Sequence, residues 1–206
     1  YEVSAAIEAK CAADGCDFAI LLGVFVSLVT YLYRASHPEV VVRVPDPRAP
    51  RRRLTTDPSL PECPQLRLVR IDGPLFFGAI AYVTERLRLI QNRPPRQRHL
   101  LVLARQVSFM DSTGAEMIGR ENGRLKADGG QLYFHQLTDR NRALLDRMGI
   151  AKSIGGEEVF FESKGEAIAA IFKQLDPDIC QRCTVRIFNE CKAVPRPSPD
   201  GGAGSR

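Results

Sequence analysis

Apolar positions between Gln65 and Leu175 follow two different periods, which predict the elements of one folded domain. Residues 66–71 and 75–77 have the composition of strands, and the turn at 72–74 predicts that they form a hairpin. The apolar residues that follow have helical spacing, and the helix they predict ends at the two prolines within 92–95. The inward positions of this helix are Ile80, Val83, Leu87 and Ile90.

Strands and helices alternate through the rest of this region. The run 100–103 is apolar throughout, as expected of a strand covered on both faces, and 131–135 is another strand. Thr138 caps a short helix, and after a strand at 159–161 a capping box of Ser163 and Glu166 starts the last one. This order predicts an α/β domain with a mostly parallel sheet packed against helices. The helix after residue 111 faces inward with Ala115, Ile118 and Leu125.

The turn between the strand 100–103 and the next helix carries the most informative polar residues. Thr113 and Glu116 have capping-box spacing, so the helix should begin near Gly114 and point its free N–H groups at Asp111 and Ser112. Such a helix start suits a phosphate or another anion. An alternative of equal weight is that these side chains bind no ligand and only satisfy backbone donors at a buried turn.

An uncharged apolar stretch, 18–33, lies near the start of the chain. It is slightly shorter than the roughly 20 residues of a bilayer span, so a buried core helix and a signal peptide are alternatives. Four acidic residues against one lysine in 1–17 oppose a signal peptide. Terminal tyrosines and the following arginines favour a membrane helix with everything after Arg34 in the cytoplasm. Because the chain begins with Tyr1, we expect a fragment whose residues 1–36 hold a last transmembrane segment.

Prolines and arginines dominate residues 37–64, which are predicted to be a linker before a domain at 65–176 and a tail at 177–206. Within the linker, 40–44 could form a short strand. Its basic side chains either lie near anionic headgroups or are simply solvated.

The formal charge of +5 is a local feature of the linker. Without Trp, and without basic and aromatic residues interleaved along a strand, the chain lacks the pattern of a nucleic-acid-binding surface, so we expect no nucleic-acid partner. The arginines that produce the excess are Arg43, Arg48, Arg51, Arg52 and Arg53.

Cysteines and histidines supply no complete chemical site. Cys180, Cys183 and Cys191 suggest zinc but lack a fourth ligand, which only Cys63 or His135 could supply through the fold. Free thiols are therefore expected, with no metal, and no nucleophile, base and orienting residue occur together. We expect neither enzymatic activity nor a cofactor.

The segment Asp111-Ser112-Thr113-Gly114 matches the Asp-Ser-Ser-Gly-type loop of the STAS domain (sulfate transporter and anti-sigma factor antagonist), and the order of the elements resembles that domain too. Residues 73–79 and 149–155 resemble the version attached to sulfate permease (SulP) transporters. Residues 19–38 are similar to the last transmembrane helix of those transporters and the exit into their cytoplasmic tail.

This resemblance implies a cytoplasmic regulatory module of a secondary anion transporter in the inner (plasma) membrane, packed against upstream transporter helices and homo-oligomeric with the full carrier. It marks Ser112 as the candidate phosphorylation site, and Asp111, Ser112, Thr113 and Gly114 as a loop for a regulatory protein or an anion. Thr113 replaces the second serine of the pattern. The alternative is a soluble switch, resembling the anti-sigma antagonists or binding a nucleotide, which would have no use for the apolar helix.

Overall fold

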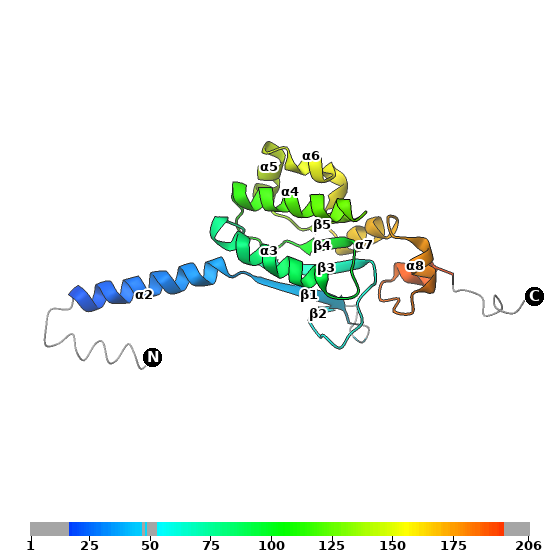
Figure 1. The fold of residues 1–206 in the computed structure, drawn as a ribbon, viewed down its shortest axis with the longest axis horizontal. Coiled ribbons are helices and arrows are strands. Elements are labelled where there is room, and N and C mark those ends of the chain that lie inside the picture. Colours follow the sequence, from blue (N-terminus) through cyan, green and yellow to red (C-terminus); the bar gives the residue numbers. More distant parts are fainter. Residues whose placement is uncertain (1–16, 47, 49–52, 196–206) are drawn as a thin grey trace, which may run out of the picture.

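A computed structural model describes residues 17–46, 48 and 53–195 of the chain. The start of the predicted membrane segment, the arginines Arg51 and Arg52, and the end of the tail lie outside these residues. Six strands form one mixed sheet in the order β2-β1-β3-β4-β5-β6, flanked by helices (Figure 1). The predicted α/β class with a STAS-like fold is confirmed.

The strands are β1 (Glu39–Pro45), β2 (Leu54–Thr55), β3 (Leu66–Asp72), β4 (His99–Leu103), β5 (Gln131–His135) and β6 (Phe160–Phe161). The run from β3 to β6 is parallel, whereas β1 pairs antiparallel with β2 and β3. The helices are α2 (Asp17–Ser36), α3 (Phe77–Asn92), α4 (Ser112–Ala127), α5 (Asp139–Arg147), α6 (Ile150–Ile154), α7 (Lys164–Phe172) and α8 (Pro177–Arg182), with short 3-10 turns at Gly156–Val159 and Glu190–Ala193.

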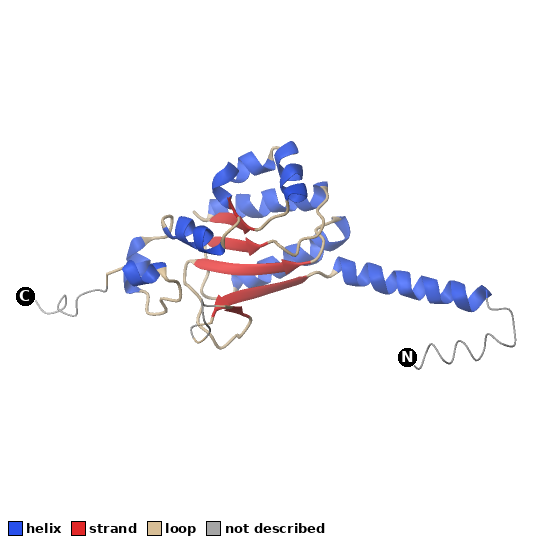
Figure 2. Ribbon diagram, turned by 180° about the vertical axis from the view of Figure 1, so that it is seen from behind, coloured by secondary structure: helices blue, strands red, loops and turns tan. Residues whose placement is uncertain are grey.

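Helices α3 and α4 pack side by side against the sheet, and the strands are seen from the opposite side in Figure 2. Helix α7 contacts β5 and β6. The β4 strand is buried at every position, which agrees with the uninterrupted apolar run at 100–103. The predicted inward residues of α4, Ala115, Ile118 and Leu125, are buried as well.

The predicted hairpin at the start of the domain is wrong. Leu75 forms an isolated parallel bridge with Met110, and helix α3 begins at Phe77, where the second strand was expected. The antiparallel partner of β3 is instead β1, with Glu39 opposite Asp72. Gly73, at φ 134°, directs the chain toward the loop before α4 rather than back along β3, and its N–H donates to Gln106 at 3.1 Å. The sheet thus includes β1 and β2 from the stretch predicted as a linker.

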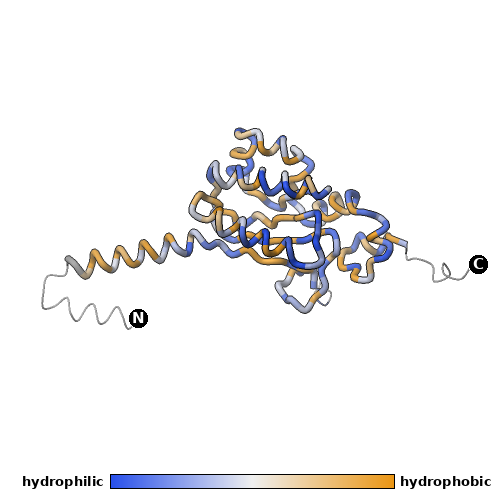
Figure 3. Tube along the Cα trace, viewed as in Figure 1, coloured by the Kyte–Doolittle hydropathy of each residue, from blue (hydrophilic) through white to orange (hydrophobic). Residues whose placement is uncertain are grey.

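Helix α2 extends away from the sheet and exposes its apolar side chains (Figure 3). Among the described residues it is the one helix long and apolar enough to cross a membrane, and none of its apolar window is buried. Its C-terminal end meets the domain through aromatic contacts: the ring of His37 stacks on Tyr33 at 4.4 Å and lies tilted against Tyr82 of α3 at 4.7 Å, measured between ring centroids.

The antiparallel pairing of β1 with β3 gives the sheet two distinct ends. The helix end, where β1 begins beside the end of β3, receives α2 and the loop that precedes α4. The cysteine end, where β3 and β4 begin, receives α8 and the segment after it (Figure 1).

Candidate functional site

The loop between β4 and α4 is fixed at the helix end of the sheet by backbone hydrogen bonds to the residues that follow β3. Leu75 donates its N–H to the carbonyl of Phe109 at 2.8 Å and accepts from the N–H of Asp111 at 3.1 Å. Leu75 is itself buried in the core. Asp111 is therefore held by main-chain contacts on the strand side before its side chain makes any bond.

The carboxylate of Asp111 caps two helices at once. One oxygen accepts from the N–H of Gly114 in the first turn of α4 at 2.8 Å, and the other accepts from the N–H of Phe77 at the start of α3 at 2.9 Å. Both bonds satisfy donors that a helix start leaves free, and both helix dipoles favour the negative charge. This one side chain thus joins α3 to α4 at their N-termini.

The predicted capping box of Thr113 and Glu116 does not form at this helix start. The N-cap is Asp111, in extended conformation, and α4 begins at Ser112 rather than near Gly114. Glu116 instead pairs with Arg120 at 3.6 Å on an exposed face. A short carboxylate at the N-cap accepts from the N3 N–H directly, which leaves no role for a threonine two residues later.

Gly114 is required by close approach rather than by an unusual backbone angle. A Cβ at this position would lie 2.4 Å from the carbonyl oxygen of Leu75 and 3.0 Å from Cγ of Met110. The first of these atoms belongs to the backbone and is hydrogen-bonded to Asp111, so it has little freedom to move. The glycine therefore allows α4 to start directly against the segment that follows β3.

Ser112 is exposed at the first position of α4, beside two aromatic side chains that also face solvent. The side chain of Phe77 is 75% exposed and that of Phe109 is 39% exposed. The guanidinium carbon of Arg140 lies 5.5 Å from the centre of the Phe109 ring. We call these four residues the loop face, and it combines a hydroxyl, two aromatic rings and a cation.

The loop face is better suited to a protein contact or a covalent modification than to a free anion. The carboxylate of Asp111 already occupies the two helix starts that would otherwise attract an anion. A phosphate on Ser112 would sit at the positive end of α4, with Asp111 opposing it through like charge. Exposed aromatic residues and arginine are the side chains most enriched at protein interfaces.

The second cap of Asp111 could not be inferred from motif spacing, because Phe77 lies 34 positions away. One signal in the sequence does point to it. Helix α3 starts after Phe76, whose side chain makes no capping hydrogen bond. A helix start without a polar residue needs its cap from elsewhere in the fold.

The structure separates the two candidates for a fourth cysteine partner. His135 ends β5 at the helix end of the sheet, whereas Cys63 precedes β3 at the cysteine end, where Gln65 donates to the sulfur of Cys180. Cys63 is buried and the other three are half-buried, all as free thiols. In the described ranges, no three His, Cys, Asp or Glu side chains stand ready to hold a metal ion.

Two of the three histidines, His37 and His99, contact aromatic rings. His99 is buried with its ring 6.1 Å from that of Tyr133, and burial lowers its pKa, with the neighbouring Arg98 adding to the effect. The pKa of His135 is also lowered, chiefly by burial and then by Lys164.

Comparison with known proteins agrees with this geometry. The STAS domain family model matches residues 57–167. Over 100 residues the chain is 30% identical to "Putative sulfate transporter YvdB" of Bacillus subtilis (strain 168), which covers 48% of this chain and 18% of that protein. Over 158 residues it is 27% identical to "Probable sulfate transporter 4.2" of Arabidopsis thaliana, covering 71% of this chain and 23% of that protein.

Among solved structures, the murine Slc26a9 anion transporter in its inward-facing state superposes with a TM-score of 0.64 at 14% identity, covering 79% of this chain and 26% of that one. At this identity the likeness shows the fold. The chain spans less than a quarter of the length of the two curated relatives. With the family model matching more than half of its length, this chain belongs to the STAS domain family and is homologous to SulP-type sulfate transporters.

Proposed function

We propose that this chain is the cytoplasmic regulatory part of a secondary anion transporter, joined to the membrane by α2, with the loop face as its regulatory contact. The observation that carries the proposal is the direct passage from an exposed apolar helix into the first strand of a STAS sheet. Only His37 and Pro38 separate Ser36, which ends α2, from Glu39, which starts β1. The sulfate transporters that the chain resembles supply the anion class.

The exposure of α2 argues for a membrane as its surroundings. Side chains such as Leu21, at 67% exposure, would leave a long apolar surface in water. Under the positive-inside rule, Arg34 and the basic residues beyond it support a cytoplasmic position for the sheet. A soluble switch protein, the alternative reading, has no element that would cover this helix.

Regulation rather than catalysis is the role that the loop face supports. Its hydroxyl, that of Ser112, lies beside a carboxylate that is fully engaged with backbone N–H groups, so no general base is free to activate it. The hydroxyl of Ser112 is exposed at the start of α4, where a protein kinase can reach it. We therefore propose Ser112 as the phosphorylation site and a regulatory rather than an enzymatic role for the loop.

Anion uptake by the complete transporter tests the regulatory assignment. Ser112→Glu places a negative charge at the start of α4 and should change the uptake rate, while Ser112→Ala should keep the unmodified rate. Ser108→Glu is the matched control, because Ser108 is also exposed in the same loop but precedes the capped helix start. Equal uptake by all three variants, at equal protein levels, would rule out a switch at Ser112.

Membrane attachment has its own test. The full chain should need detergent or lipid to stay monodisperse, whereas a chain that starts at His37 and keeps β1 should be soluble without either. A full chain that remains monodisperse in buffer would show that α2 is not a membrane helix, whatever the uptake assay gives.

A further inference from the structure

A cleft of about 690 Å³ opens beside β5 at the cysteine end of the sheet. It exists because β6 has only two residues and pairs with β5 at Phe134 and His135, which leaves the first half of β5 without a strand on that side. Its lining comes from the starts of β4 and β5, from the turn Gly156–Val159, and from the end of α7 with the residues directly after it. Ligand clefts in proteins have volumes of roughly 300–1,000 Å³, so a small molecule fits here.

The edge of β5 at this cleft is closed to a further strand. The N–H of Leu132 donates to the side-chain oxygen of Asn122 at 3.1 Å. The side-chain amide of Gln131 donates to the carbonyl of Ile154. Side chains thus take the place of a neighbouring strand, and an added peptide would find the Leu132 donor already engaged. The cleft is suited to a ligand that is held by side chains.

Two buried polar side chains, those of His99 and Tyr133, line the cleft without hydrogen-bond partners. His99 is 8% exposed and Tyr133 is 5% exposed. They share one face of the sheet, because His99 lies opposite Gln131 and alternate residues of a strand point the same way. Their ring centroids are 6.1 Å apart. Nδ1 of His99 is buried without a partner, and the hydroxyl of Tyr133 makes no hydrogen bond to the described part of the chain.

Such unpaired groups destabilise a fold, so two of them in one cleft indicate a ligand that supplies the missing bonds. Burial keeps both groups neutral at physiological pH. It raises the pKa of Tyr133 to about 12, and together with the neighbouring Arg98 it lowers the pKa of His99. The phenol therefore has an O–H to donate, and the imidazole offers one donor and one acceptor. A hydroxyl or carbonyl group of a ligand matches this pair.

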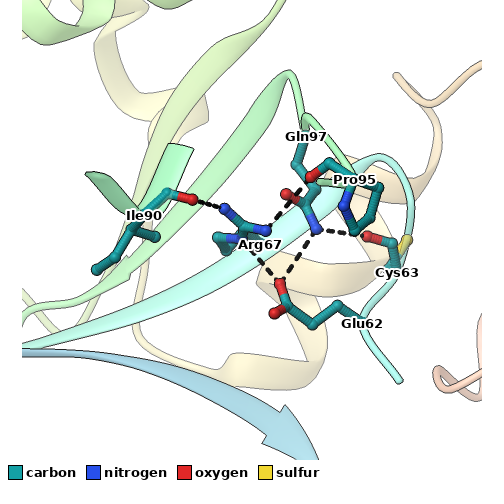
Figure 4. A network of polar contacts seen from close by, with 6 residues as sticks. All are labelled: Glu62, Cys63, Arg67, Ile90, Pro95 and Gln97. Atoms are coloured by element: carbon teal, nitrogen blue, oxygen red, sulfur yellow. Dashed lines mark hydrogen bonds and ion pairs between the residues drawn. The ribbon is translucent and has the colours of Figure 1, made fainter. Parts of the chain in front are cut away.

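The backbone that leads into His99 is held by a network of polar side chains around Arg67 (Figure 4). The amide of Gln97 donates to the carbonyl oxygen of Cys63 at 3.0 Å and to the carboxylate of Glu62 at 3.2 Å. The buried guanidinium of Arg67 donates to that same carboxylate at 2.8 Å. The imidazole is thus presented from an anchored segment, as a preorganised binding site requires.

Charged side chains from two elements lie at the surface of the cleft. Lys173, directly after α7, is exposed and forms no ion pair among the described residues. Glu158, in the 3-10 turn, is exposed as well and repels a second negative group. Between the charged surface and the buried pair, the ring of Phe161 lies 6.5 Å from that of Tyr133, centroid to centroid, and favours a flat apolar body.

We propose that this cleft binds a small planar organic acid, with its single acid group toward Lys173 and a hydroxyl or carbonyl group at its far end that hydrogen-bonds to His99 and Tyr133. An inorganic oxyanion is too small to reach both ends, and a diacid meets Glu158. The site lies at the opposite end of the sheet from the loop face, so the inference does not depend on the role of Ser112.

The test is a titration of the full chain in detergent, followed by ligand NMR, with empty micelles as the blank. The probes are para-hydroxybenzoate, benzoate, which lacks the hydroxyl, and phenol, which lacks the acid. Para-hydroxybenzoate should bind best, and benzoate about 10-fold more weakly because the buried pair stays unpaired. Equal affinities for the three probes, displacement by sulfate, or the same signal from empty micelles would overturn the proposal.

Variants decide which side chain meets which end of the ligand. Tyr133→Phe should weaken para-hydroxybenzoate by about 10-fold and leave benzoate unchanged, which also shows that the variant is folded. Lys173→Gln should weaken both acids by about 2- to 5-fold, as expected of an exposed ion pair, and leave phenol unchanged. Lys192→Gln is the matched control, because Lys192 is exposed but does not line the cleft. If Tyr133→Phe binds para-hydroxybenzoate like the parent chain, or weakens all probes equally, the site is refuted.

Discussion

The two ends of the sheet are stabilised in different ways. At the helix end, backbone hydrogen bonds and a single carboxylate, that of Asp111, fix the loop and leave a serine exposed beside it. At the cysteine end, long polar side chains fix the backbone, and among them Cys63 is buried and the other three thiols are half-buried. A surface for transient contact needs rigid geometry and access, whereas a structural connection needs burial and several anchors.

The largest expected effect of a single substitution is at the cysteine end. Arg67→Ala removes the partner of Glu62 and leaves the carbonyls of Pro95 and Ile90 without their donor, so the free energy of unfolding should fall by about 3 kcal/mol. For a domain of this size, that lowers Tm by roughly 10 °C in a thermal melt of the full chain in detergent. Arg67→Lys keeps the charge but not the planar guanidinium, so its Tm should lie between those of the parent chain and Arg67→Ala. A Tm unchanged by Arg67→Ala would mean that the network does not support this end.

Asp111→Ala should have the next largest effect, because it uncaps two helices. Each lost cap costs about 1 kcal/mol, so the free energy of unfolding should fall by about 2 kcal/mol, measured in the same melt. Asp111→Asn keeps one acceptor oxygen and should lose about half as much. If Asp111→Asn and Asp111→Ala were equally destabilising, the charge rather than the double cap would carry the effect.

The two ends should also differ in their response to acid. Burial lowers the pKa of both His99 and His135, so the unfolded chain binds protons more readily, and stability falls as the pH drops below the ordinary histidine value of 6.5. The more deeply buried His99, at 8% exposure, should contribute more. Between about pH 7.5 and pH 5, the fall in Tm with decreasing pH should therefore be reduced more by His99→Gln than by His135→Gln. The reverse order would contradict the burial argument.

Ser112→Glu should have the smallest effect on stability, within about 0.5 kcal/mol, because the side chain is exposed at the positive end of α4. The same melt measures it, beside the uptake assay. A large loss of stability would show that the serine supports the fold, and any change in uptake would then have to be attributed to unfolding.

Sequence reasoning located the loop more reliably than its contacts. The run Asp111 to Gly114 is contiguous, so its place between a buried strand and a helix followed from local pattern alone. Its cap did not, because Asp111 and Thr113 each have a backbone N–H three residues ahead, that of Gly114 and that of Glu116, and local spacing does not choose between them. The prediction of a strand at 75–77 was wrong for a related reason. The pattern of a short apolar run does not specify its partner, and in the fold Leu75 pairs with Met110 rather than with β3.

Pairings between distant segments were beyond the reach of the pattern. The short strand at 40–44 was allowed, but its place as the partner of β3 depends on the antiparallel register set in three dimensions. Cys63 and His135 were equal candidates beside Cys180 until the direction of β5 put them at opposite ends of the sheet. Periodicity reports which face of an element is buried, and it does not report what lies against that face.

The joint between α2 and the sheet is only two residues long, and one of them is a proline whose Cβ lies 2.8 Å from where a side chain on Gly73 would begin. Pro38 is buried there, and the exposed ring of His37 contacts Tyr33 on one side of the joint and Tyr82 on the other. Such a short, packed connection has no slack to absorb torsion. Helix α2 therefore cannot turn about its own axis without carrying β1, and with it the whole sheet, through the same rotation.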